Sequence, residues 1–102
     1  MEDKRAHGRV PLNLRMSCER VGGTAFEVLA KDISLGGMYI ESEVGVTFGT
    51  ELTFVGRLPG AKAESRLPAV VRWTKPGGFG VQFGLLGALE THIISQLMKP
   101  KG

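Results

Sequence analysis

Short segments in which apolar and polar residues alternate, separated by glycine-rich turns, fill most of this chain. In the clearest of them every second residue from 10 to 18 is apolar. A period of two puts these side chains on one face of a β-strand. The same reasoning predicts strands near residues 26–31, 38–40, 52–55, 63–73 and 79–83. Six short strands in so small a chain favour an antiparallel sheet closed into a barrel, because closure leaves no exposed edge.

The pattern changes only at the C-terminal end, where apolar residues recur at helical spacing. These residues are Leu86, Leu89, Ile93, Ile94 and Leu97. Pro100 cannot continue a helix, and the apolar stripe needs the side or end of the sheet as cover. We therefore expect an all-β fold, a six-stranded antiparallel β-barrel with a C-terminal α-helix, over residues 10–102. Residues 1–9 lack an apolar pattern through Gly8 and are expected to form a flexible N-terminal arm.

Length and composition exclude several classes of protein. The 102 residues suffice for one small domain, and no apolar run approaches the ~20 residues that cross a bilayer. The charged N-terminus has no signal-peptide core, so we expect a cytoplasmic protein without membrane insertion. One cysteine, Cys18, cannot form an internal disulfide, and His7 and His92 do not have metal-ligand spacing. The formal net charge is +3, and its basic residues gather toward both ends of the chain, which suits an anionic ligand or an ordinary solvated surface.

Two arginines four positions apart, Arg5 and Arg9, precede the first predicted strand. A guanidinium group is a planar, bidentate donor that suits phosphate oxygens and the O6/N7 edge of guanine. Taken alone, this spacing is also compatible with a solvated basic segment that leads into the barrel.

A polar turn between the second and third predicted strands offers a carboxylate, a hydroxyl and two glycines. These residues are Asp32, Ser34, Gly36 and Gly37. Asp and Ser commonly satisfy backbone donors in such turns, and glycine permits a sharp bend, so a purely structural role is one interpretation. At a barrel rim, however, the same carboxylate and hydroxyl can face a ligand clamped by the arginines.

The ordered pair of motifs resembles the signature of PilZ domains, which are bacterial receptors for cyclic di-GMP. Arg5-x-x-x-Arg9 is followed, after 22 residues, by Asp32-x-Ser34-x-x-Gly37. The stretch from Gly37 to Ile40 is typical of the strand after the second motif, and residues 80–83 resemble the closing strand of the family. The resemblance covers roughly residues 4–98. It implies a six-stranded barrel with a terminal helix, in agreement with the periodicity.

The resemblance also implies a binding role for each residue of the motifs. Arg5 and Arg9 would grip guanine edges and phosphates, while Asp32 would accept from guanine N–H groups and hold an arginine. Ser34 would bond to a base or a phosphate. Gly36 and Gly37 would let the backbone approach the nucleotide. The N-terminal arm would then fold over the ligand and signal to an unidentified partner protein in motility, polysaccharide or biofilm control.

Two further positions are candidates by the same resemblance. A cation at Lys4, just before the first arginine, favours binding of two stacked ligand molecules. Trp73 is placed where some relatives stack an aromatic ring on guanine, although a tryptophan of the core or rim is an equal alternative. The sequence contains no nucleophile–base–orienter set and no metal-binding cluster. We expect a binding protein without cofactor or metal, and not an enzyme.

Two other functions remain open from the sequence. One is a ligand-blind, PilZ-like adaptor that only recruits a partner protein. The other is a small basic barrel that binds RNA or single-stranded DNA, which would depend on many charges and on aromatic platforms. The retained arginine pair and acidic turn argue against the adaptor, and the modest net charge argues against a nucleic-acid partner.

Overall fold

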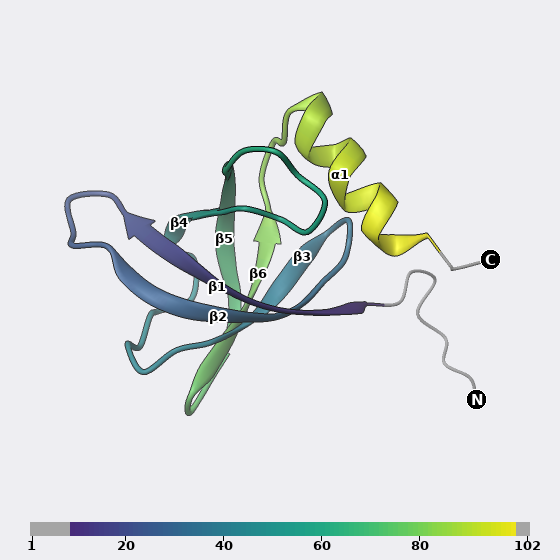
Figure 1. Cartoon of the computed structure of the whole chain (residues 1–102). Helices are drawn as coiled ribbons and strands as arrows, with labels where there is room; N and C mark the ends of the chain where they lie inside the picture. The colour runs from purple at the N-terminus through teal and green to yellow at the C-terminus, as the bar shows by residue number, and fades with distance from the viewer. Residues whose placement is uncertain (1–8, 100–102) are drawn as a thin grey trace, which may run out of the picture.

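The computed structural model describes residues 9–99, which form six β-strands followed by one α-helix (Figure 1). The elements are β1 (Val10–Arg20), β2 (Phe26–Ile33), β3 (Gly37–Glu41), β4 (Glu51–Gly56), β5 (Ser65–Lys75), β6 (Gly78–Phe83) and α1 (Ala88–Met98). Every predicted strand has a counterpart. β5 lies two residues further along the chain than predicted, because it continues into a tight turn at Pro76 and Gly77, where Gly77 has a φ of 83°.

The sheet closes into a barrel with the strand order β1-β2-β3-β6-β5-β4. All neighbouring strands are antiparallel, and the pairing of β1 with β4 joins the two ends of the sheet. Hairpins account for the pairs that are consecutive in sequence, whereas β3 with β6 and β1 with β4 join distant segments. The predicted six-stranded antiparallel barrel with a C-terminal helix is therefore confirmed.

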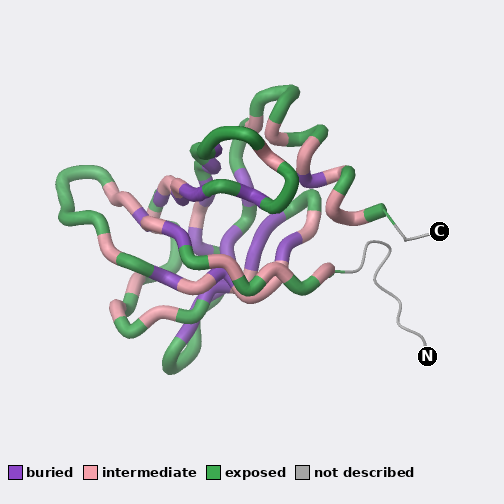
Figure 2. The backbone as a smooth tube through the Cα atoms, in the orientation of Figure 1, coloured by how far each residue is buried: buried purple, intermediate pink, exposed green. Residues whose placement is uncertain are grey.

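Buried positions recur along the strands (Figure 2), and their aliphatic, aromatic and sulfur-containing side chains form the core inside the barrel. Alternation explains its composition, since inward residues of β1 such as Met16 and Cys18 are buried while their sequence neighbours are not. Met38 of β3 and Phe54 of β4 are fully buried as well. The interpretation of Cys18 as a core residue is confirmed.

Helix α1 covers one side of the barrel through its middle and its end. Ile94 is fully buried, and Ile93 and Met98 pack against the core. The predicted stripe is wrong at Leu89, whose exposed fraction is 65%, whereas Ile93, Ile94 and Met98 further along the helix pack in or against the core. Within residues 9–99 this helix is too short to cross a membrane, and no longer apolar helix is present there.

The strand pairing has three register shifts, one in β1 between Pro11 and Leu14 and two β-bulges in β2 and β5. β2 has one unpaired residue opposite β3, at Lys31, and β5 has one opposite β6, at Arg72. An extra residue reverses which side chains face the core, because the side-chain period of a strand is two. Asp32 and Trp73 directly follow the bulges and face outward, although the alternation before the bulges would point both inward.

Candidate functional site

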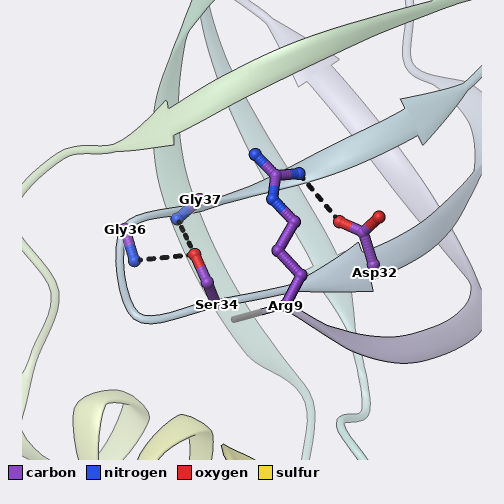
Figure 3. Close-up of polar contacts among 5 residues, drawn as sticks. All are labelled: Arg9, Asp32, Ser34, Gly36 and Gly37. Carbon is purple, nitrogen blue, oxygen red and sulfur yellow. Dashed lines mark hydrogen bonds and ion pairs between the residues drawn. The ribbon is translucent and has the colours of Figure 1, made fainter. Parts of the chain in front are cut away.

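The two sequence motifs meet at an ion pair on the outer surface of the barrel. Arg9 precedes β1 and Asp32 lies near the end of β2, and antiparallel pairing sets Pro11 opposite Asp32. Arg9 Nη1 donates a hydrogen bond to Asp32 Oδ1 at 2.9 Å (Figure 3). The exposed fractions of the two side chains are 35% and 29%, so both remain accessible. Arg5 and Lys4, the other predicted ligand cations, lie outside the described residues.

Ser34 organises the turn that follows Asp32. Its Oγ accepts hydrogen bonds from the backbone N–H groups of Gly36, at 3.1 Å, and Gly37, at 3.3 Å (Figure 3). The Ser34 N–H in turn donates to the Gly37 carbonyl oxygen at 2.8 Å. This is the local structural role that the sequence left open for the turn. Both side-chain bonds use the hydroxyl oxygen as acceptor, so its proton can still be donated to a ligand.

The two glycines of the turn lie in different surroundings. A Cβ added to Gly37 would lie 1.9 Å from the carbonyl oxygen of Val81 in β6, so this glycine is needed for barrel closure. A Cβ on the exposed Gly36 would meet only Ser34 Oγ, at 3.9 Å. The Cα of Gly36 is therefore open to an approaching group, although its N–H bonds to Ser34 Oγ and its carbonyl oxygen accepts from the Phe83 N–H, whereas the Cα of Gly37 is covered by β6.

A row of outward-facing residues extends from the ion pair across four strands. Asp32 of β2 pairs with Tyr39 of β3, Tyr39 with Gly80 of β6, and Gly80 with Trp73 of β5. Tyr39 and Trp73 stack with their ring centroids 5.5 Å apart and their planes 9° from parallel. The exposed fraction of Trp73 is 43%, so Trp73 is a surface residue and not a core residue.

Sequence reasoning missed Tyr39 as a residue of this surface. It sits between Met38 and Ile40, which are both fully buried, so alternation alone turns its side chain outward. Its position two residues after Gly37, the last residue of the second motif, was the available sign that Tyr39 lies near the site. The ammonium group of Lys75 also lies over the Tyr39 ring, 5.1 Å from the ring centre.

The surface is suited to binding a flat, anionic ligand. The guanidinium of Arg9 can donate to phosphate or to a guanine edge, and the carboxylate of Asp32 can accept from a base N–H. No group of three His, Cys, Asp or Glu side chains in residues 9–99 is arranged to hold a metal ion. A separate groove of about 370 Å³ lies on another part of the wall, around Thr53 and Pro68, and includes none of these residues.

Cys18 is separate from this surface. Burial raises the pKa of its thiol to about 12, so the thiol stays protonated inside the barrel at neutral pH.

Comparison with known proteins gives a family for the chain. The PilZ domain model matches residues 3–99. No curated protein matches the sequence significantly. Among solved structures, the PilZ domain of CeSA from a cellulose-synthesizing bacterium has a TM-score of 0.70 at 17% identity, over 89% of this chain and 94% of that one.

Two longer proteins share the fold. PlzA of Borreliella burgdorferi, solved in complex with c-di-GMP, has a TM-score of 0.70 at 17% identity over 95% of this chain. The inhibitor of motility MotI of Bacillus subtilis has a TM-score of 0.68 at 20% identity, also over 95%. The chain spans only 42% of the first and 50% of the second. At these identities the likeness is one of fold.

Proposed function

The chain belongs to the PilZ domain family, and on that premise we propose that it is a receptor for cyclic di-GMP. PilZ domains form a cyclic di-GMP-binding family of regulatory modules, so the proposal assigns no catalysis to this chain. One solved protein of the same fold, PlzA, was crystallised with this nucleotide.

The observation that supports the proposal most directly is the contact between Arg9 and Asp32. These residues are 23 positions apart and belong to separate motifs, yet their side chains are in hydrogen-bond contact on an accessible surface. The carboxylate holds the guanidinium in place, which lowers the entropy that the arginine would lose on binding. Both groups match the chemistry of a guanine nucleotide, which offers acceptors to arginine and N–H donors to a carboxylate.

In the proposed complex each motif residue has a defined task. Arg9 bonds to phosphate or guanine while Asp32 accepts from a guanine N–H, and Ser34 donates its hydroxyl proton. The open Cα of Gly36 allows close approach, and Gly37 keeps the turn against β6. Arg5 completes the arginine pair and Lys4 favours a second nucleotide molecule, and both roles rest on the sequence motif alone. Trp73 offers a face for stacking on a base.

The proposed output is a contact with another protein. Binding would order residues 1–9 over the nucleotide and present a new surface to a cytoplasmic partner, which belongs to motility, polysaccharide or biofilm control. The name of MotI, an inhibitor of motility, gives a precedent for such an output in a protein of this fold.

Calorimetric titration of the full chain with cyclic di-GMP tests the proposal. We expect the wild type to bind, and Arg9→Ala and Asp32→Ala each to weaken binding at least about tenfold. Arg66→Ala is the matched control, because Arg66, near the start of β5, forms an exposed ion pair with Glu19 that involves neither motif. Equal losses in all three variants would show that any removal of charge matters, and would refute a specific site.

The same titration separates the other two functions. A folded wild type that gives no heat with the nucleotide would be a ligand-blind adaptor. A nucleic-acid binder would lose affinity about a thousandfold or more between 50 and 200 mM salt for an oligonucleotide, and Asp32→Ala would not weaken it.

A further inference from the structure

The outer face of β6 has no side chains at two positions, and aromatic rings from the neighbouring strands cover both. A Cβ added to Gly78 would lie 2.4 Å from the hydroxyl oxygen of Tyr39. A Cβ added to Gly80 would lie 2.3 Å from both Cε2 and Nε1 of Trp73. Tyr39 reaches over β6 from β3 on one side, and Trp73 from β5 on the other.

The indole of Trp73 is therefore held from two directions. Gly80, its direct neighbour across the β5–β6 pair, leaves the space that the indole occupies. Tyr39 stacks against it nearly in parallel, at a centroid separation of 5.5 Å. Aromatic pairs at this separation attract one another beyond the effect of burial alone. The remaining 43% of Trp73 stays exposed on the face that also carries Asp32.

We propose that Tyr39 and Gly80 are positioning residues that hold Trp73 as a preformed stacking surface for a guanine base. The inference rests on the proposed function and adds two residues outside the sequence motifs. An indole already fixed in orientation loses little freedom when a base stacks on it, so more of the stacking energy appears as affinity. Tyr39 affects ligand binding only through Trp73. The stack requires the aromatic ring of Tyr39 and not its hydroxyl.

The ligand-free protein tests the positioning itself. Trp73 is the only tryptophan of the chain, so tryptophan fluorescence reports on it alone. We expect Tyr39→Leu and Gly80→Ala to shift its emission and to speed the decay of its anisotropy, and Tyr39→Phe to leave both unchanged. Phe26→Leu, which removes an aromatic residue at the far end of β2, is the matched control. Unchanged fluorescence in Tyr39→Leu would overturn the inference.

Titration with cyclic di-GMP tests whether the positioning serves the ligand. We expect Trp73→Leu to weaken binding about 5- to 150-fold and Tyr39→Leu about 2- to 10-fold, with Tyr39→Phe close to wild type. Because Tyr39 is inferred to act through Trp73, adding Tyr39→Leu to Trp73→Leu should cause no further loss.

The outcomes separate the two levels of the proposal. If the wild type binds, and Tyr39→Leu weakens binding by the same factor in the wild type and in Trp73→Leu, the positioning role is overturned and the receptor function stays intact. A wild type that does not bind cyclic di-GMP would overturn the receptor function, and with it the ligand role of Trp73.

Discussion

Gly37 and Val81 approach each other so closely that no side chain fits between them. An added Cβ at Gly37 would lie 1.9 Å from the Val81 carbonyl oxygen, in the pairing of β3 with β6 that joins distant parts of the chain. Barrel closure alone therefore requires a glycine at position 37, the last position of the second motif, whether or not a ligand binds. Its neighbour Gly36, in contrast, is open on the surface.

We predict that Gly37→Ala lowers the free energy of unfolding by about 3 kcal/mol or more, since backbone atoms cannot rotate away from the added methyl group. Gly36→Ala should change it by less than about 1 kcal/mol, because its Cβ meets only Ser34 Oγ at 3.9 Å. Urea unfolding of both variants measures the difference. Equal values for the two would contradict the close approach of β3 and β6.

Ser34→Ala should destabilise the turn by about 1 kcal/mol, because the Gly36 and Gly37 N–H groups lose their shared acceptor. Ser34→Thr keeps a hydroxyl and should retain most of the stability. Thermal unfolding, together with hydrogen exchange of these two amides, measures the effect. Unchanged exchange in the alanine variant would mean that the backbone alone fixes the turn.

The Arg9–Asp32 pair should matter little for stability. Both side chains are about one-third exposed, and exposed ion pairs contribute about 0–1 kcal/mol. We therefore predict that Asp32→Ala lowers the free energy of unfolding by less than about 1 kcal/mol in the absence of nucleotide. A much larger loss in urea unfolding would make the pair a structural element, and would weaken its assignment to a binding site.

Cys18 should make stability fall at alkaline pH. The folded thiol has a pKa of about 12 instead of 9.0, so above pH 9 the unfolded state releases a proton that the folded state keeps. Its contribution is unchanged below pH 9 and becomes less favourable by about 1 kcal/mol between pH 9 and 10. Urea unfolding across this range should give a steeper loss in wild type than in Cys18→Ala. Parallel curves would refute the pKa shift.

Asn13 has a φ of 52°, in the left-handed region, where β1 changes register against β2. Asn13→Gly should leave stability nearly unchanged, because glycine tolerates this conformation. Asn13→Val should cost about 1–2 kcal/mol, since a branched side chain does not fit it. Thermal unfolding of the pair tests this, and equal melting temperatures would contradict the left-handed backbone.

Alternation and helical spacing were enough to predict the barrel and its helix, because an inward face must be apolar in a small domain. The contact of Asp32 with an arginine was implied by the resemblance of the motifs to PilZ domains, and the structure shows it with Arg9. Alternation did not predict which way Trp73 points. Residues 67, 69 and 71 of its strand are buried, so unbroken alternation turns Trp73 inward, and only the bulge at Arg72 reverses it.

Bulges depend on pairing with a neighbouring strand, so the sequence of one strand does not reveal them. The stack on Tyr39 was hidden for the same reason: Tyr39 and Trp73 come from β3 and β5, and β6 lies between them. Contacts of this kind follow from register, which single-strand patterns do not specify.

The unpaired residues Lys31 and Arg72 each separate an inward-facing residue from an outward-facing one. Ala30 and Val71, just before them, are buried, whereas Asp32 and Trp73, just after them, face outward. Deleting either unpaired residue would join these neighbours directly and restore regular alternation, with each flank keeping its present face. Strand length can therefore vary by one residue at positions 31 and 72 without turning Asp32 or Trp73 toward the core. Family alignments that place a gap at either position would still pair residues that face the same side of the barrel wall.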